Sequence, residues 1–139
     1  MDQISWLGSP PGGGRSDPKN DPRPLLAVTM GDPAGIGPEI VLKALRRAEV
    51  FERCRPLVIG DRRILERASS WVGCGPLRFE QVSAPEEGRY EPGSVPLLDL
   101  NNAAPEDCPA GQIGAAAGRA AVEYVFRACD LALAGQVDG

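Results

Sequence analysis

The chain has 139 residues, of which 42% are hydrophobic and 24% charged, and its formal net charge is −4. This length suits one domain with a core, at roughly 100 to 200 residues per domain, and no apolar run approaches the roughly 20 residues of a membrane-spanning helix. Scattered arginines and only two lysines leave no basic face for a nucleic acid. We therefore expect a cytoplasmic protein that binds neither nucleic acid nor membranes.

Residues 1–24 differ in composition from the rest of the chain. They are rich in Pro and Gly and poor in apolar side chains, so that burial cannot repay the entropy of ordering them. We expect them to form a disordered extension. From Leu25 onward, short apolar runs alternate with longer amphipathic ones, which is typical of βα units. The predicted fold class is α/β, with a three-layer α/β/α architecture over residues 25–139.

The predicted elements follow in chain order. A strand over 25–30 precedes a helix from Pro38 to about Ala48, whose apolar face holds Ile40, Val41, Ala44 and Leu45. A buried strand over 56–60 leads to a helix over 62–72, which has Ile64, Leu65 and Ala68 on one face and ends at Gly73. Two further strands, over 77–82 and 95–100, are expected to form an edge of the sheet.

The last predicted helix runs from about Gly114 to Ala134. Its apolar residues recur at steps of three and four: Ile113, Ala117, Ala120, Tyr124, Ala128 and Leu131. The chain then leads into Val137-Asp-Gly139, which is the start of an incomplete βαβ unit, because a crossover helix normally returns the chain to a parallel strand. Without covering strands, we expect this apolar face to be exposed and the isolated chain to aggregate or bind a hydrophobic dye.

The four cysteines, Cys54, Cys74, Cys108 and Cys129, form no C-x-x-C pair, and the chain has no histidine to complete a zinc site. We interpret them as reduced, buried small side chains. The alternative of a reactive thiol applies only to Cys74, which lies in a Gly-Cys-Gly turn.

A glycine-rich turn joins the first predicted strand to the first helix, and it is the candidate ligand loop. Its candidate residues are Gly31, Asp32, Gly35 and Gly37. The turn lies at the carboxyl edge of a parallel sheet, where open α/β folds bind ligands, and the helix start favours an anion. The glycine spacing matches neither G-x-G-x-x-G nor a Walker loop. The Asp32 carboxylate is equally suited to bind a substrate hydroxyl or a neighbouring backbone group. Glu39 lies in the first helical turn, where a negative charge is favourable without any ligand.

Other polar residues follow the second and fourth predicted strands, namely Asp61, Asp99, Asn101 and Asn102. Their positions at strand ends allow them to face a cleft. Asp and Asn are also the usual residues of turns, and we prefer that interpretation.

Three segments carry a resemblance to a known family. They are Thr29-Met-Gly-Asp-Pro-Ala-Gly-Ile-Gly-Pro-Glu39, Val58-Ile-Gly-Asp61, and the long helical region Gly111-Gln-Ile-Gly-Ala-Ala-Ala-Gly-Arg119 through Ala128-Cys-Asp-Leu-Ala-Leu-Ala-Gly135. Together they resemble the 4-hydroxythreonine-4-phosphate dehydrogenase family of vitamin B6 biosynthesis. The resemblance spans residues 25–139 and excludes everything before Leu25.

The resemblance implies a homodimeric enzyme with an isocitrate/isopropylmalate dehydrogenase-like fold, here incomplete at the carboxyl terminus. Family members oxidise a small phosphorylated hydroxy acid with NAD and a divalent metal (Zn, Mg or Co) held by histidines and an aspartate. Those ligands, the substrate-binding His-Thr pair and most cofactor contacts lie beyond the position corresponding to Gly139. We therefore expect no catalytic or metal residue in this chain, no cofactor bound by it alone, and no activity of it alone.

The implied function is the amino-terminal part of an NAD- and metal-dependent dehydrogenase that oxidises 4-phosphooxy-threonine. A paralogous 4-phospho-threonate or 4-phospho-erythronate dehydrogenase is one alternative, since the signature over 31–39 is shared. A non-catalytic truncated product is the other.

Overall fold

The computed structural model describes residues 20–73, 75 and 77–139. Its centre is a four-stranded sheet with the order β1-β2-β4-β3. The strands are β1 (Leu25–Thr29), β2 (Arg55–Gly60), β3 (Arg78–Gln81) and β4 (Ser94–Asp99). All neighbouring pairs are parallel. The predicted α/β class is confirmed.

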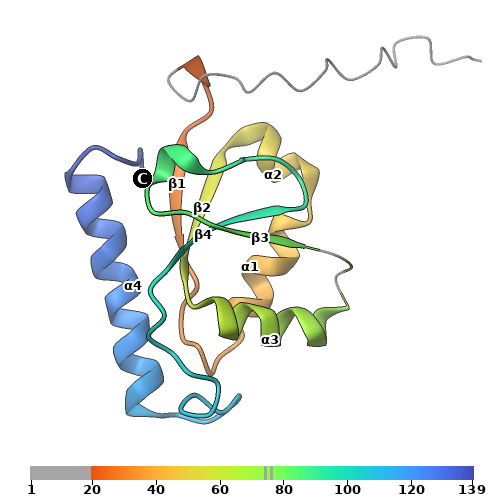
Figure 1. Ribbon diagram of the computed structural model, residues 1–139, viewed down its shortest axis with the longest axis vertical. Helices are drawn as coiled ribbons and strands as arrows, with labels where there is room; N and C mark the ends of the chain where they lie inside the picture. Colours follow the sequence, from red (N-terminus) through yellow and green to blue (C-terminus); the bar gives the residue numbers. More distant parts are fainter. Residues whose placement is uncertain (1–19, 74, 76) are drawn as a thin grey trace, which may run out of the picture.

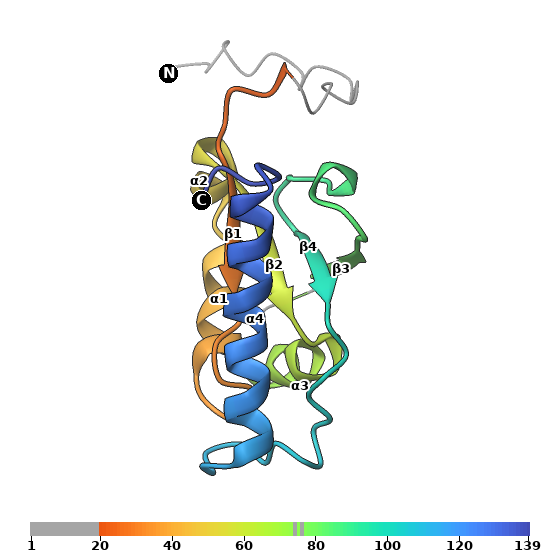
Figure 2. The same ribbon diagram turned by 90° about the vertical axis from the view of Figure 1, so that its left-hand side faces the viewer.

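Helices cover both faces of this sheet. On one face lie α1 (Gly37–Leu45), α2 (Ala48–Arg53) and α3 (Arg62–Val72), and on the other lies α4 (Ala115–Leu133) (Figures 1 and 2). A short 3-10 helix, Pro85–Glu87, follows β3. The arrangement is the expected three-layer one. None of the helices in the described part of the chain is long and apolar enough to cross a membrane.

The first predicted helix is two helices in the structure. The chain leaves α1 after Leu45, and Arg47 adopts an extended conformation with φ −83° and ψ 118° before α2 begins. Phe51 follows Leu45 by six residues, so in one straight helix it would point away from the core. The break at Arg47 lets both side chains be buried.

The inward face of α1 also differs from the prediction. Pro38, Val41, Leu42 and Leu45 are buried, whereas Ile40 is 54% exposed and Ala44 is exposed. The reason is that α1 packs against α3, which lies beside it on the same face of the sheet. Leu42, on the side of α1 opposite Ala44, therefore supplies the contact.

β3 and β4 pair with each other at one end of the sheet, as predicted, but β4 is not itself an edge strand. β4 pairs with β2 on one side and β3 on the other, so that only β3 lies at the edge. The burial pattern explains this order. The first five residues of β4 are buried, as an internal strand requires, whereas both ends of β3 are exposed.

The apolar face predicted for α4 packs on the sheet. Ala117, Ala120, Tyr124 and Leu131 are buried, and α4 contacts β1 and β2. The expectation that this face is exposed is wrong, because the strands already present cover it. Ile113, which was assigned to the same face, precedes the helix and is fully exposed.

After α4 the chain returns to the sheet. The N–H of Asp138 donates to the carbonyl of Leu25 (2.8 Å), and the N–H of Ala27 donates to the carbonyl of Gly139 (2.7 Å). These bonds advance in the same direction along both segments, as in parallel pairing. The last residues therefore occupy the outer edge of β1, on the side away from β2.

The cysteines follow the predicted burial only in part. Cys108 is buried and Cys54 is half-buried, but Cys129 is exposed on α4, which corrects the expectation that it is buried. Burial raises the pKa of the Cys108 thiol. Cys74 lies outside the described residues.

An ion-pair network anchors the segment before β1. Arg23 donates three side-chain bonds to Asp21 and further bonds to the carbonyls of Phe51 and Tyr90. Arg55 donates to the carbonyl of Arg23 (2.9 Å). The predicted disorder of residues 1–24 concerns mainly residues outside the described part of the chain. Within that part, this network ties the approach to β1 to α2 and β2.

Acid is expected to weaken this anchor. The side-chain hydrogen bond from Arg23 lowers the pKa of Asp21 from 3.8 to about 2. A carboxyl whose pKa is lower in the folded chain stabilises the fold above the unfolded value, and this contribution is lost as the pH falls from about 4 to about 2. Asp21→Asn should cost about 1–2 kcal/mol near pH 7, as measured by urea unfolding, and much less near pH 2.

The control for this prediction is Asp107→Asn, a change in an exposed loop. We expect it to alter the free energy of unfolding by less than about 0.5 kcal/mol at either pH. An equal cost of Asp21→Asn at both pH values would contradict the assignment of this network to the charged carboxylate.

Candidate functional site

Three segments meet at the carboxyl end of the sheet: the glycine-rich loop over 31–36 after β1, Asp61 after β2, and residues 99–103 at the end of β4 and beyond it. Backbone hydrogen bonds set their relative positions. The N–H of Met30 donates to the carbonyl of Ile59 and that of Leu100 to the carbonyl of Gly60, each at 2.9 Å. This is the edge at which open α/β sheets bind ligands.

Two candidate glycines have structural explanations within the chain itself. Gly31 has φ +79°, a conformation that other residues rarely adopt. Gly37 lies against the end of β1, where a Cβ atom would come within 2.3 Å of the Met30 carbonyl oxygen. These glycines let α1 start directly against the strand, so that their presence requires no ligand.

Asp32 and Gly35 form the turn of the loop. The Asp32 carboxylate accepts a hydrogen bond from the N–H of Ala34 (2.8 Å), and its carbonyl accepts one from the N–H of Gly35 (3.0 Å). Asp32 is nevertheless exposed. Asp32 therefore holds the turn by hydrogen bonds to neighbouring backbone groups, while its carboxylate stays accessible to a ligand.

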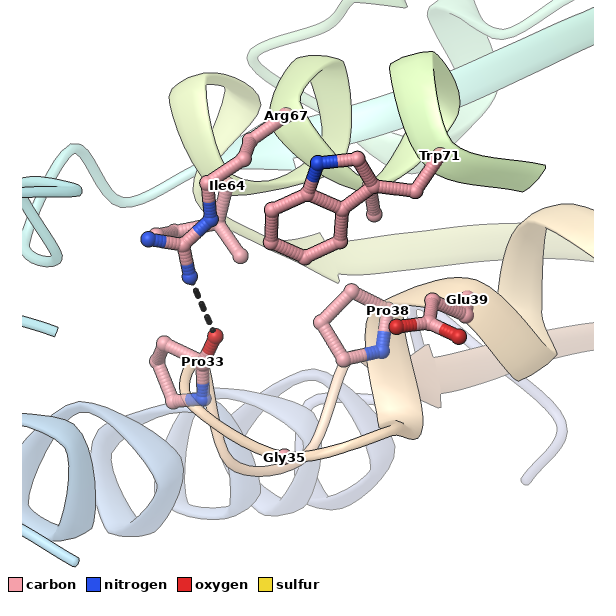
Figure 3. A pocket seen from close by; sticks show the side chains of 8 residues that line it. Pro33, Gly35, Pro38, Glu39, Ile64, Arg67 and Trp71 are labelled. Carbon is pink, nitrogen blue, oxygen red and sulfur yellow. Dashed lines mark hydrogen bonds between the residues drawn. The ribbon is translucent and has the colours of Figure 1, made fainter. Parts of the chain in front are cut away.

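Arg67 on α3 holds the loop in place, a role that the sequence analysis missed. Its guanidinium donates to the carbonyl of Pro33 (3.0 Å) and to that of Cys108 (2.9 Å). It also lies 5.3 Å from the centre of the Trp71 ring. Figure 3 shows the guanidinium reaching Pro33 while Trp71 faces Pro38. Nothing in the helical pattern of α3 distinguished this arginine from the others.

A shallow pocket surrounds this contact (Figure 3). Its lining residues come from the loop, the start of α1 and one face of α3: Pro33, Gly35, Pro38, Glu39, Ile64, Arg67, Ala68 and Trp71. A second contact closes the loop from the other side, where the N–H of Gly111 donates to the carbonyl of Ala34 (2.7 Å). The loop is thus held between α3 and the segment that precedes α4.

Asp61 is fully buried and links three segments. Its carboxylate accepts bonds from the backbone N–H of Arg63 (2.9 Å), the Arg63 guanidinium (2.8 Å) and the N–H of Ala103 (2.8 Å). Burial alone would raise the pKa of Asp61, but these hydrogen bonds and the Arg63 charge together lower it. Asp61 caps α3 and fixes the chain after β4.

Asp99 and its neighbours serve the turn after β4. Asp99 accepts bonds from the N–H of Arg62 (3.2 Å) and of Asn101 (3.0 Å), and Asn101 has φ +49°. The Asn102 amide donates to Glu123 on α4. The bond between Asp99 and Asn101 is a turn contact, the interpretation preferred for this group, whereas the bonds to Arg62 and Glu123 join distant segments.

Among the described residues, no three His, Cys, Asp or Glu side chains lie together as metal ligands would. The places that Cβ atoms of Gly35 and Gly37 would take are bordered by the chain's own atoms, those of Asp32 and Met30 respectively. Close packing within the chain therefore accounts for these two glycines.

Comparison with known proteins shows which family this chain resembles. Residues 52–139 match the family model described as pyridoxal phosphate biosynthetic protein PdxA. The D-threonate 4-phosphate dehydrogenase of Cupriavidus necator is 44% identical over 119 residues, which cover 86% of this chain and 35% of that protein. A relative from Symbiobacterium thermophilum is provisionally named D-threonate 4-phosphate dehydrogenase. It is 48% identical over 118 residues, which cover 85% of this chain and 35% of that protein.

A solved structure shows the same fold. The crystal structure described as a 4-hydroxythreonine-4-phosphate dehydrogenase from Burkholderia phymatum superposes with a TM-score of 0.79 at 44% identity, over 84% of this chain and 35% of that one. The chain thus spans about a third of the length of the relatives it matches.

Proposed function

Because the chain belongs to the PdxA family of pyridoxal phosphate biosynthetic proteins, we propose that it forms the amino-terminal part of a dehydrogenase acting on a 4-phosphorylated hydroxy acid. The observation that carries this proposal is the match of almost the whole described fold to dehydrogenases at 44% identity. The family model and the structural match support oxidoreductase chemistry in vitamin B6 biosynthesis or a related reaction.

We propose D-threonate 4-phosphate as the substrate, with 4-hydroxythreonine 4-phosphate as the second candidate. The names of the Cupriavidus and Symbiobacterium relatives support the first. The family description and the name of the Burkholderia structure support the second. Both molecules carry a phosphate, and both are oxidised at a hydroxyl group.

The finer properties of the family are also proposals for this chain. They include NAD as the oxidant, a divalent metal, a homodimer and a cytoplasmic location. In this proposal the loop that holds Gly31, Asp32, Gly35 and Gly37 lies beside the ligand, which is supported by its place at the carboxyl end of β1. NAD and the metal ion would be held by segments outside this chain.

The test is an assay of the polypeptide that carries this sequence in its source cells. An antibody raised against the 139-residue chain would isolate it, and its intact mass would be measured. Its reduction of NAD would be followed with each substrate and Mg²⁺, Zn²⁺ or Co²⁺. We expect a mass well above 14.7 kDa and NADH formation with D-threonate 4-phosphate.

The same assay on the recombinant 139-residue chain is the control, for which we expect no NADH above the rate without protein. If the native polypeptide turns over 4-hydroxythreonine 4-phosphate but not D-threonate 4-phosphate, the second candidate is the substrate. A native mass of 14.7 kDa without activity would replace the proposal by a non-catalytic product.

A further inference from the structure

The outward side of α4 carries an apolar surface with no partner among the described residues. Val122, Val125, Phe126 and Leu133 are 52%, 50%, 64% and 88% exposed. Together with the exposed Cys129, these residues form what we call the α4 outer stripe. They recur at steps of three and four, so they lie along one side of the helix.

The α4 outer stripe is a second apolar face, distinct from the one that packs on the sheet. The buried residues Ala117, Ala120 and Tyr124 point to β1 and β2, and helical geometry centres the stripe on nearly the opposite side of α4. A helix that is apolar on both sides is typical of a position between two layers. The structure provides one of these layers.

A glycine supports the same conclusion. Gly118 precedes Val122 by one turn and lies in line with the stripe, and a Cβ atom there would meet nothing within 4 Å. Glycine inside a helix is less favourable than alanine by about 1 kcal/mol. No described neighbour accounts for it, whereas close approach of another element at this point would.

The direction of the chain indicates what covers the stripe. Asp138 and Gly139 already pair with the outer edge of β1, next to α4. The relatives continue for about two thirds of their length outside the matched segment, which is 35% of the Symbiobacterium protein. A parallel strand continuing at this edge would need its own covering helix, beside α4 and on the same face of the sheet.

We propose that the α4 outer stripe is an intramolecular docking surface for the carboxyl-terminal two thirds of the family fold. The occupant is an apolar element of that part, packed across Val122, Phe126 and Leu133 and close to Gly118. This inference rests on the proposed function only for the existence of such a part.

The test uses Cys129 as a reporter. The 139-residue chain would be compared with a chimera in which it continues from Gly139 into the matching carboxyl-terminal part of the Symbiobacterium relative. Both would be treated with N-ethylmaleimide, and modification of each cysteine would be followed by peptide mass spectrometry. We expect Cys129 to react at least about tenfold more slowly in the chimera, and half-buried Cys54, at the end of α2 on the other face, to be unchanged.

Two variants of the chimera complete the test. Phe126→Asp should lower its melting temperature but leave that of the 139-residue chain unchanged, because Phe126 is 64% exposed there. Ile40→Asp on α1, at a position 54% exposed, is the matched control and should behave alike in both proteins.

Unchanged Cys129 reactivity in a folded chimera would overturn the proposal. Protection of Cys129 in the 139-residue chain that disappears on dilution would also overturn it, in favour of a second copy on this face. If the chimera is insoluble, the 139-residue chain and the carboxyl-terminal part of the relative would be coexpressed as separate polypeptides. If the coexpressed parts are insoluble as well, although the 139-residue chain alone is soluble, that result counts against the docking surface. Protection without dehydrogenase activity would support it and contradict only the proposed function.

Discussion

Gly37→Ala is expected to lower the free energy of unfolding by about 3 kcal/mol, at the upper end of the usual range for overpacking. The added methyl group would lie 2.3 Å from the carbonyl oxygen of Met30, a backbone atom that cannot rotate away. Either α1 or the end of β1 would have to move. The better helix propensity of alanine offsets only about 1 kcal/mol. Urea unfolding followed by circular dichroism would measure the change.

Gly35→Ala is the matched control, two residues away in the same loop. Its methyl group would lie 3.4 Å from the Asp32 Cβ, and its backbone is not left-handed. We expect a cost below about 1 kcal/mol. Equal effects of the two substitutions would show that the close approach of α1 to β1 does not determine the loop. If both variants fold fully but lose ligand binding in the intact enzyme, the glycines act on the ligand instead.

Asp61→Ala is expected to cost about 3–4 kcal/mol near pH 7. The substitution removes the cap of α3, leaves the N–H of Ala103 buried without its acceptor, and deprives Arg63 of its ion-pair partner. The loss should be largest at the junction between β2 and the segment after β4. Hydrogen exchange at the Ala103 amide, compared between the two proteins, would locate it.

The pH dependence of this cost distinguishes the loss of a charged side chain from the loss of side-chain volume alone. Because the pKa of Asp61 is lowered below 3.8 in the fold, its charged form stabilises the protein above about pH 4 and less as the pH falls further. The difference between the two proteins should therefore shrink in acid. Asp99→Ala is the control: Asp99 also accepts two backbone bonds but is only half-buried, and we expect about 1 kcal/mol. A cost for Asp61→Ala that did not change with pH would contradict the role of the charge.

Local patterns in the sequence were sufficient where local physics decides the structure. The helix over 62–72 has the predicted bounds and buries Ile64, Leu65 and Ala68, and it ends at Gly73 with φ +57°. Apolar periodicity and the left-handed preference of glycine are properties of neighbouring residues, so they can be read from the chain.

The same reasoning failed where a contact joins distant segments. The position of β4 inside the sheet, the break at Arg47 that buries Phe51, and the burial of the α4 inner face all depend on what packs against them. A periodic pattern shows that a face is apolar, but not which neighbour covers it. For that reason the apolar face of α4 was expected to be exposed to solvent, although the sheet covers it.

For the candidate site, the sequence by itself determined the glycine-rich loop, its place after β1 and the family resemblance, because these rest on residue identity and order along the chain. Only the tertiary structure decided what those residues do. It showed that Gly37 is required by the Met30 carbonyl, that Arg67 holds the loop from α3, and that Asp61 is fully buried. Such roles arise from atoms brought together across many residues, and the free energy of each contact depends on burial that no single segment specifies.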